Sequence, residues 1–580
     1  MTPYTPPTQD QLLAIRVNAG IEEIAASEKF AGAESDLVEA IVGGVGEFAA
    51  GEFAPLNRVG DLEGAKLENG VVRLPDGFAE AYEAYVEQGW NAITSPEEFG
   101  GQGMPFTLSC NVLENLGAAN MAFTLLPMLS VGAIEAIAHH GSDAQKAKYM
   151  PNLVSGAWSG TMNLTEPQAG SDVGALRSTA EPITDGAHAG KYKIKGQKIY
   201  ITWGDHELAG NIVHLVLARL PDAPEGTRGI SLFLVPKYHV ADDGTIGAKN
   251  DLRPVSLEHK LGINASPTCV MSYGDNDDCI GELVGAENRG LMAMFTMMNN
   301  ARINVGNQGA QIAERATQQA IQYATDRVQS SRAGAADKSP VAIIEHPDVR
   351  RMLLRMKSLT EGVRALLYFC SGQVDRGTLG DEAAAMRAEV LVPLLKAWGT
   401  DVGVEVSGIG VQIHGGMGFV EETGAAQHWR DSKIAPIYEG TNGIQAADLV
   451  TRKLGMDDGG AVLTLLADIE RDCADEPNLA ALAKDCTAIA EWMRSDASLD
   501  DRLAGSVPFC TMMAVAVAGW QLVKQARAVA DGASPALAKS KPVTARFFVD
   551  RIVPEAAGLK ASAIAGAAGL YELPAEALAS

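Results

Sequence analysis

The sequence predicts an α+β protein that is mainly helical, with an N-terminal helical domain, a central β-barrel domain, a C-terminal helical bundle and an additional C-terminal helical domain. Two observations support this prediction. The hydrophobic spacing is helical at first, gives way to short apolar runs separated by turns, and then becomes helical again. The chain of 580 residues is also too long for one compact core. We place the domains at residues 1–157, 158–283, 284–457 and 458–580.

The first two domains differ in the period of their apolar residues. Residues 36–50 and 77–88 are Ala-rich and amphipathic, which predicts helices in the first domain. Residues 212–217 and 230–235 are short apolar runs and residues 192–195 alternate, as expected of strands. Turns rich in Gly, Asp and Pro separate these runs. The second domain is therefore expected to be a small β-barrel, with a sandwich as the alternative.

Helical spacing returns near Asn288 and dominates the rest of the chain. Apolar stripes run through residues 291–298, 305–323 and 352–366, so that each helix buries one face in a bundle. The methionines in these stripes are interpreted as core residues. A further helical stretch follows the glycine pair at 459–460, which indicates an added domain behind a short linker.

Composition and charge exclude several classes of partner and site. The net charge of −25 argues against a nucleic acid or an anionic membrane, because both require a basic surface. The seven cysteines form no CxxC pair and the ten histidines show no metal-ligand spacing, so neither a disulfide framework nor a metal centre is expected. Residues 1–10 lack the apolar core of a signal peptide, and the longest apolar run, residues 512–523, is too short to span a bilayer. A cytoplasmic location is expected.

The segment around Glu439 carries a distinct chemical signal. Residues 434–437 are apolar and offer no partner to an acid, and Tyr438 and Gly440 flank the carboxylate. A carboxylate among apolar neighbours loses hydration, so its pKa rises and it becomes a stronger base once deprotonated. The alternative is an ordinary helix-capping or solvated glutamate.

Two glycine-containing segments offer backbone contacts to a ligand. Residues 162–174 combine Thr, Ser, Gly and backbone donors in one loop, which suits the edge and the face of a flat heterocycle. A polar β-turn is the alternative. Residues 412–419 hold three glycines in four positions, which permits close contact with a pyrophosphate or a sugar. This segment is not GxGxxG and lacks a βαβ unit, so a Rossmann interpretation fails.

Together these segments resemble the acyl-CoA dehydrogenase family. Asn163, Gln427 and Tyr200 depart from the family pattern, in which a small residue, a basic residue and a flavin-stacking Trp are usual. We expect these departures to affect substrate and flavin tuning more than the reaction. The resemblance covers roughly residues 40–454 and includes the domain order. Its motifs are residues 164–172 (LTEPQAGSD), 412–419 (QIHGGMGF), 430–434 (RDSKI) and 438–441 (YEGT).

The resemblance implies a flavoprotein with FAD as its cofactor and an acyl-CoA thioester as its substrate. Glu439 would take the α-proton as general base while the β-hydrogen leaves as hydride to flavin N5. The Glu439 backbone N–H would help to stabilise the enolate oxygen. Some branches of the family place the base on the bundle instead, but the corresponding window, residues 298–302, contains no carboxylate. Glu439 is therefore the catalytic candidate.

The same resemblance implies contacts to the cofactor and the substrate. From the residues alone, Arg327 would be interpreted as an ordinary solvated cation at a helix end, and Arg302 as an ordinary cation on the face of a helix. Because Arg327, Gln412 and Gly416 would reach the FAD of a neighbouring subunit, the resemblance also implies a homo-oligomer, at least a dimer. The implied FAD contacts are Met162, Leu164, Thr165, Tyr200, Thr202, Arg327, Gln412, Gly415, Gly416, Thr441 and Asn442, and the implied substrate contacts are Ser171, Arg302 and Gly440.

In finer detail the chain resembles the long members of the family, which carry an extra C-terminal domain and include methylmercaptopropionyl-CoA dehydrogenases. The matching stretches are residues 162–167, 258–263, 294–299 and 346–352. The resemblance therefore favours a short acyl chain, with or without a thioether, over a long one. It also implies that an electron-transfer flavoprotein accepts the electrons.

Two other functions are kept as alternatives. An acyl-CoA oxidase would share the half-reaction but let oxygen reach the reduced flavin, so hydrogen peroxide would form at the rate of flavin reduction. A non-enzymatic, DNA-binding flavoprotein would need a basic C-terminal face. Here residues 459–500 are strongly acidic and residues 530–580 carry balanced charges. Salt-sensitive duplex binding would indicate this second alternative.

Overall fold

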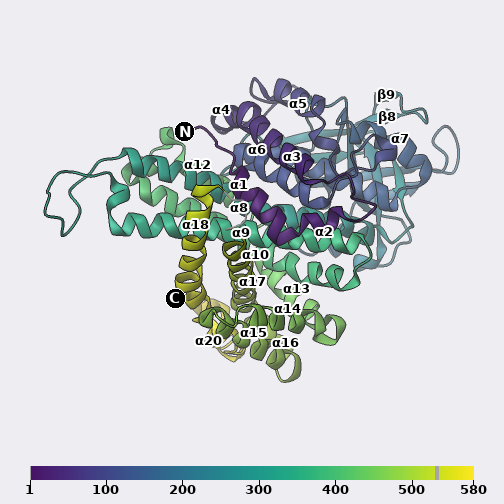
Figure 1. The fold of residues 1–580 in the computed structure, drawn as a ribbon. Coiled ribbons are helices and arrows are strands. Elements are labelled where there is room, and N and C mark those ends of the chain that lie inside the picture. The colour runs from purple at the N-terminus through teal and green to yellow at the C-terminus, as the bar shows by residue number, and fades with distance from the viewer. Residues whose placement is uncertain (1, 530–533, 580) are drawn as a thin grey trace. The chain divides into compact units, whose positions relative to one another are not determined.

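The structure is a computed structural model that describes residues 2–529 and 534–579 (Figure 1). The chain forms two compact units. The barrel unit comprises Phe48–Met104 and Ala119–Ala301, and the helical unit comprises Met1–Glu47, Pro105–Ala118 and Arg302–Ser580. The N-terminal and C-terminal segments therefore belong to the same unit. The predicted domain boundaries at residues 157, 283 and 457 stay predictions.

The main sheet of the barrel unit closes on itself. Its strands follow the order β10-β11-β5-β12-β7-β6-β3, and β4 pairs with both β5 and β6. Strands β5, β12, β7, β6 and β4 therefore form a ring, which confirms the predicted barrel. The strands are β3 (Trp158–Asn163), β4 (Thr179–Pro182), β5 (Tyr192–Thr202), β6 (Asn211–Arg219), β7 (Ile230–Pro236), β10 (Leu252–Leu257), β11 (Thr268–Tyr273) and β12 (Ile280–Val284); two small hairpins are formed by β1 (Lys66–Glu68) with β2 (Val71–Arg73) and by β8 (Tyr238–Val240) with β9 (Ile246–Lys249).

Burial explains why two strands appear in the sequence as continuous apolar runs. Every residue of β7 and all but the last of β6 are buried, so both faces of these strands are covered. Strand β5 has exposed and half-buried positions between its buried ones, because one of its faces lies outside the barrel. Ile194, Val216 and Phe233 belong to the cluster that fills the barrel.

Helices accompany the barrel in the same unit. They include α4 (Ala54–Glu63), α5 (Phe78–Glu87) and α7 (Asp143–Val154). The long helix α6 (Phe106–His140) belongs to the helical unit up to Ala118 and to the barrel unit from Ala119, and it is kinked at Asn120, where φ is −157° and ψ is 92°. The Asn120 side chain accepts a hydrogen bond from the Phe123 N–H at 3.1 Å, which helps the helix to resume after the kink.

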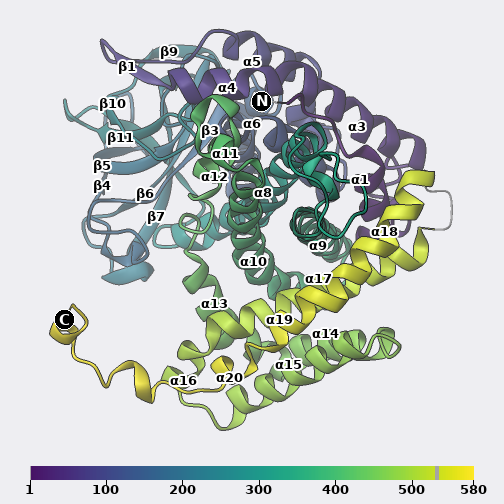
Figure 2. The same ribbon diagram turned by 90° about the vertical axis from the view of Figure 1, so that its left-hand side faces the viewer.

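Long helices form the core of the helical unit. Helices α9 (Pro347–Thr378), α10 (Glu382–His414) and α17 (Ser506–Ala528) pack against one another (Figures 1 and 2). Helix α8 (Gly290–Asp326) approaches α10 so closely that a Cβ at Gly309 would lie 1.8 Å from the Gly399 carbonyl oxygen. The other helices in this part of the chain are α1 (Thr8–Ala14), α2 (Ile21–Ala25), α3 (Ser35–Phe48), α11 (Gly416–Phe419), α12 (Ala425–Ser432), α13 (Asn442–Thr451), α14 (Gly460–Asp472), α15 (Pro477–Ser495), α16 (Leu499–Ala504), α18 (Pro535–Phe547), α19 (Val553–Ala557) and α20 (Lys560–Ala563).

The C-terminal helices are integrated into the helical unit. Helix α17 packs on α9, α10 and α13, and α14, α15 and α16 surround its outer side (Figure 2). The expected glycine linker at 459–460 is not an open linker. Gly459 has φ of +87° at the start of α14, and a Cβ there would meet the Arg494 guanidinium carbon at 2.2 Å. Both glycines therefore belong to a packed helix start.

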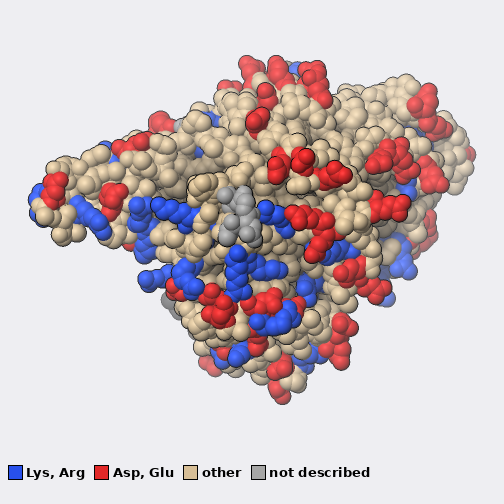
Figure 3. Space-filling view, viewed as in Figure 1, with Lys and Arg blue, Asp and Glu red and all other residues tan. Residues whose placement is uncertain are grey.

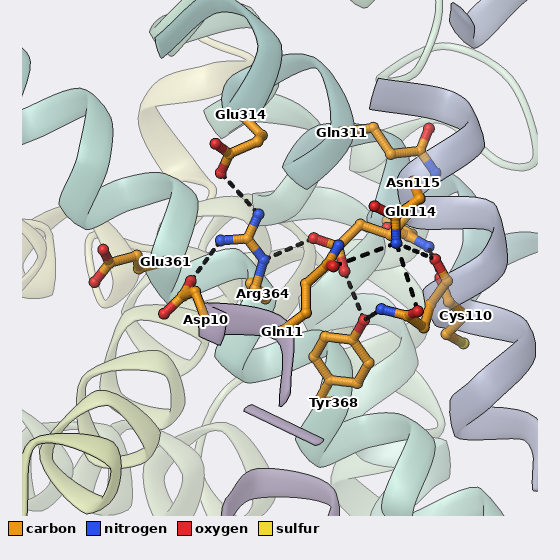
Figure 4. Close-up of polar contacts among 12 residues, drawn as sticks. Asp10, Gln11, Cys110, Glu114, Asn115, Gln311, Glu314, Glu361, Arg364 and Tyr368 are labelled. Atoms are coloured by element: carbon orange, nitrogen blue, oxygen red, sulfur yellow. Dashed lines mark hydrogen bonds and ion pairs between the residues drawn. The ribbon is translucent and has the colours of Figure 1, made fainter. Parts of the chain in front are cut away.

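Buried ion pairs connect the two ends of the chain to the core helices (Figure 4). Arg364 of α9 binds Glu114 of α6 at 2.6 Å, Asp10 of α1 at 2.6 Å and Glu314 of α8 at 2.8 Å. Lys541 of α18 binds the same Asp10 and also Glu361 of α9, the latter at 2.8 Å. The side chains of Arg364 and Lys541 are almost completely buried. Asp10 is thus shared by a cation of the core and a cation of the C-terminal domain.

Two helices of the described chain, α6 and α17, are long and apolar enough to cross a membrane. In the most apolar 18-residue stretch of each helix, 89% (α6) and 83% (α17) is buried inside the protein. The apolar run 512–523 thus lies in a longer apolar helix than expected. Its burial, rather than its length, identifies α17 as a core helix. All seven cysteines are buried and free in the structure.

Charge is unevenly distributed on the surface. Figure 3 shows acidic side chains over much of one face and basic side chains gathered near α18. A cleft of about 760 Å³ is lined by several arginines, and two of them, Arg351 and Arg355, are paired with carboxylates. The acidic net charge therefore coexists with a local basic cleft. Its arginines are Arg332, Arg350, Arg351, Arg355 and Arg551.

Candidate active site

Glu439 lies at the tip of a tight loop between α12 and α13. The Asn442 N–H donates to the Pro436 carbonyl at 3.0 Å and closes this loop. Glu439 has φ of +54° and Gly440 has φ of +82°, so two consecutive residues adopt the left-handed conformation. Such a backbone is unfavourable for glutamate, and strain of this kind is concentrated at functional sites. Thr441 then caps α13 by accepting from the Ile444 N–H at 3.2 Å.

The Glu439 carboxylate is half-buried and unpaired. Burial raises its pKa above the ordinary value, while the positive charges of Arg302 and Lys396 act in the opposite direction. In the part of the chain that the structure describes, no group forms a hydrogen bond or an ion pair with this carboxylate. The neighbouring Tyr438 hydroxyl donates to Gln308 at 2.5 Å and fixes the loop on α8. A desolvated, unpaired carboxylate on a rigid loop is suited to act as a general base.

Asn442 is anchored to α10. Its amide nitrogen donates to the Ala397 carbonyl at 2.9 Å and to Asp401 at 2.8 Å, and its amide oxygen accepts from Lys396 at 3.0 Å. The side chain expected beside the cofactor is therefore engaged inside the helical unit. Sequence reasoning missed Lys396, a single cation in the apolar stretch 390–398 of α10. That isolation was the available signal, because a lysine among buried apolar residues requires a partner.

A second group of predicted residues lies together at adjoining ends of β3 and β5. The Ile199 N–H donates to the Thr165 carbonyl at 2.9 Å, and the Thr161 hydroxyl donates to the Thr202 carbonyl at 2.7 Å. Tyr200 has φ of +59° and is 60% exposed. In the described chain, the hydroxyls of Thr165 and Thr202 form no hydrogen bond. The structure thus brings Met162, Leu164, Thr165, Tyr200 and Thr202 together, with two hydroxyl groups available to a ligand.

Glu166, in the middle of the first motif, has a structural environment that was not anticipated. Its buried carboxylate binds Lys198 at 2.8 Å and accepts from the Ser178 hydroxyl at 2.6 Å and the Arg177 N–H at 2.7 Å. Burial alone would raise its pKa, but Lys198 and these hydrogen bonds lower it to about 2. The motif therefore includes a buried ion pair that holds the loop on β5.

Two of the departures from the family pattern point into the protein. The buried Asn163 amide oxygen accepts from the Tyr273 hydroxyl at 2.7 Å inside the barrel. Gln427 is buried and donates to Asp431 at 3.3 Å within α12. Both side chains therefore have partners inside the protein, and their expected effect on substrate and flavin tuning stays a prediction. Tyr200, the third departure, is exposed.

The glycine segment lies at the C-terminal end of α10, next to the end of α8. The ring of Tyr323 stacks on His414 with centroids 4.3 Å apart, so Gln412 and Arg327 emerge at the same end of these helices. Gly415 has φ of +60° and ψ of −138°, a conformation for glycine. A Cβ at Gly415 or Gly416 would meet no heavy atom within 4 Å, so this backbone is open to a ligand.

The predicted substrate contacts lie in different parts of the chain. Ser171 is exposed in the loop after β3, in the barrel unit. Arg302 is half-buried on α8 in the helical unit, where its charge acts on Glu439. Gly440 is confined by Gln445, whose amide nitrogen would lie 2.5 Å from an added Cβ. Among the described residues, no group of three metal-binding side chains is present.

Sequence comparison identifies the family. The family models described as acyl-CoA dehydrogenase N-terminal domain, middle domain and C-terminal domain match residues 35–157, 161–275 and 288–454. The chain belongs to the acyl-CoA dehydrogenase family. A fourth model, described as acetyl-CoA dehydrogenase C-terminal like, matches residues 465–574, so the extra C-terminal domain is shared with other proteins.

Individual members of the acyl-CoA dehydrogenase family are similar along almost the whole chain. The 3-methylmercaptopropionyl-CoA dehydrogenase of Ruegeria pomeroyi is 46% identical and matches 95% of this chain and 96% of its own. A butyryl-CoA dehydrogenase of Syntrophomonas wolfei is 36% identical, with 90% and 91% covered. The fold is also that of an acyl-CoA dehydrogenase from Bacillus anthracis solved in complex with FAD, with a TM-score of 0.74 at 22% identity over 91% of this chain and 88% of that chain.

Proposed function

We propose that the protein catalyses FAD-dependent α,β-dehydrogenation of an acyl-CoA thioester to the 2-enoyl-CoA, with Glu439 as the base. The observation that carries this proposal is the Glu439 carboxylate, which is desolvated, unpaired among the described residues and held in a left-handed backbone. Family membership makes the substrate an acyl-CoA. An ordinary capping or solvated glutamate would have hydrogen-bond partners or open water around it.

The chain supplies one group for the α-proton of the thioester and another for its carbonyl oxygen. The Glu439 carboxylate accepts the α-proton, and its raised pKa increases its strength as a base. In the described chain, the Glu439 backbone N–H has no acceptor. This N–H is therefore available to the thioester carbonyl oxygen as negative charge develops on it.

The cofactor is FAD, which supplies the acceptor of the β-hydride when bound. The residues present fit such a group. Thr165 and Thr202 offer hydroxyls that no described residue uses, and the open backbone of Gly415 and Gly416 can approach a phosphate or a sugar. Arg327 is exposed at the same helix ends and can neutralise phosphate charge.

We infer a short acyl substrate, with a methylthio group as one candidate. This inference is supported by the two similar enzymes, whose names specify a methylmercaptopropionyl and a butyryl thioester. Anaerobic bleaching of the flavin near 450 nm, measured against acyl-CoA thioesters of increasing length, tests it. Faster bleaching by a long-chain thioester than by any short one would contradict it.

The Glu439→Gln variant tests the base. Glutamine keeps the shape of the side chain but cannot take a proton, so bound FAD should be retained and turnover should fall by about three or more decades. Glu422→Gln, an exposed position on the same unit, is the matched control and should keep full activity. Retained activity of Glu439→Gln would refute the assignment.

The acceptor and the assembly are further parts of the proposal. Electrons pass to an electron-transfer flavoprotein, so reduction of that partner should outpace hydrogen peroxide formation in air. Peroxide formed as fast as the flavin is reduced would identify an oxidase instead. The proposed homo-oligomer is tested by sedimentation at several concentrations, where a monomer at all of them would exclude subunit-bridging FAD contacts. A cytoplasmic location stays a prediction.

A further inference from the structure

A buried lysine stands behind the loop that carries Glu439. Lys396 lies on α10, and its side chain is fully buried. In the described chain, its ammonium forms one hydrogen bond, to the Asn442 amide oxygen at 3.0 Å, and no carboxylate lies within ion-pair distance. A buried ammonium without a counter-ion is costly, so its retention requires a compensating role.

The charges around this lysine point to that role. The groups whose charges act on Lys396 are Glu439 in the base loop, Asp401 on its own helix and Arg302 on α8. Asp401 already accepts from the Asn442 amide nitrogen at 2.8 Å. Burial lowers the pKa of Lys396 to about 8, against the attraction of the two carboxylates, so the lysine is mostly charged at neutral pH.

The hydrogen bond from Lys396 to Asn442 both holds the base loop and brings a positive charge close to it. Asn442 closes the base loop through its backbone N–H and is the residue that Lys396 holds through its side chain. The same ammonium places a positive charge in the low-dielectric surroundings of the Glu439 carboxylate, where charges interact more strongly than in water. Both Arg302 and Lys396 lower the pKa of Glu439, and the effect of Arg302 is the larger.

We propose that Lys396 is a positioning residue for the reaction: it fixes the Glu439 loop through Asn442 and keeps the base ionised at neutral pH by its charge. This inference rests on the proposed role of Glu439. Burial pushes the carboxylate towards its protonated form, in which it cannot accept the α-proton. The Lys396 ammonium, held at the loop by Asn442, opposes this protonation. It forms no ion pair with the carboxylate, which therefore stays available to the α-proton.

Two substitutions separate the two roles. Lys396→Gln keeps a hydrogen-bond donor for Asn442 but removes the charge, whereas Lys396→Met removes both. Removing a positive charge raises the pKa of a nearby carboxylate, so the acidic limb of the flavin-reduction rate should move to higher pH by about one unit or more in both variants. Above this limb, Lys396→Gln should regain a rate close to that of the wild type, and Lys396→Met should remain at least severalfold slower. Lys484→Gln, an exposed lysine on α15, should leave the pH profile unchanged.

A titration without turnover provides the independent readout. Infrared difference spectra of wild type minus Glu439→Gln isolate the Glu439 carboxyl band, whose midpoint should rise by about the same amount in the Lys396→Gln background. A wild-type pH profile and band midpoint in Lys396→Gln would overturn the inference, as would a rate loss that is equal at every pH. Activity retained by Glu439→Gln would instead overturn the proposed base, so the two failures are distinguishable.

Discussion

Replacing Lys541 with methionine should loosen α18 from the helical unit. The side chain is fully buried and bridges Asp10 of α1 and Glu361 of α9. Methionine fills a similar volume but leaves two buried carboxylates with one cation fewer. Breaking a buried ion pair in this way costs about 3–5 kcal/mol.

The remaining contacts place the expected loss at the lower end of that range. Asp10 keeps Arg364 at 2.6 Å, and Glu361 keeps Lys357 at 2.7 Å and the Thr544 hydroxyl at 2.6 Å. Neither carboxylate is left without a partner, so we expect a loss of about 3 kcal/mol. This corresponds to a change of roughly 150-fold in the opening equilibrium of the helix.

Hydrogen–deuterium exchange of the α18 amides at pH 7 measures that opening directly. The amides should exchange roughly 150-fold faster in Lys541→Met than in the wild type. Lys539→Met, an exposed position on the same helix, is the control for side-chain removal and should exchange at the wild-type rate. Equal exchange in Lys541→Met and Lys539→Met would refute the reasoning.

The pH dependence of this cluster has a definite sign. Burial by itself would raise the pKa of Asp10 and Glu361, but Lys541 and the other nearby cations outweigh it, so both pKa values lie below their ordinary values. Their stabilising contribution is therefore fully present above the pKa of about 4 in the unfolded chain, and is lost as the pH falls through the lower folded values. In the wild type, the protection of the α18 amides from hydrogen exchange should decline below about pH 4. In Lys541→Met the decline should be smaller.

Three further predictions concern other parts of the chain. Glu166→Gln leaves Lys198 buried without its counter-ion and should lower the stability of the barrel unit by about 3 kcal/mol in urea unfolding, whereas Glu181→Gln, at an exposed position of β4, should have no effect. Gly415→Ala should weaken FAD binding in a titration by about tenfold, because alanine disfavours the backbone conformation of Gly415 and its Cβ would enter the space left open for the ligand. His206 and His214 are buried, and burial lowers the pKa of each to about 3. The unfolded chain therefore binds more protons below pH 6.5, and thermal stability of the barrel unit should fall between pH 6.5 and 5 by up to about 2 kcal/mol per histidine; a flat profile would contradict this.

Local patterns in the sequence were sufficient for the fold class. The amphipathic stretches 36–50 and 77–88 became α3 (Ser35–Phe48) and α5 (Phe78–Glu87), because helical periodicity is a property of neighbouring residues. The apolar runs 212–217 and 230–235 became β6 and β7. Closure of the barrel depends on β4, which forms a hairpin with the next strand, β5, and also pairs with β6 through Thr179 and Arg219. This second pairing joins residues far apart in sequence, so no local pattern could establish it.

The candidate site was predictable only where its chemistry is local. The apolar residues before Glu439 indicated desolvation, and in the structure burial does raise its pKa. Lys396 lies 43 positions upstream of Glu439 and was missed, because it acts through Asn442 and the packing of α10 on α13. Glu166 belongs to a predicted ligand-binding motif in the loop after β3, yet its partner Lys198 lies on β5. The roles of both lysines depend on tertiary contacts.

Net charge and local charge lead to different conclusions about this protein. The chain carries −25 overall, which argues against polyanionic partners at long range. Within a few ångströms, however, the low dielectric of the interior lets one or two cations decide the behaviour of a carboxylate. Glu439 is influenced by Arg302 and Lys396 rather than by the acidic surface, since exposed charges are screened by water and salt. If the acidic limb of the rate shifts with Lys396 but responds little to added salt, the buried cation rather than the surface sets the pKa of the base.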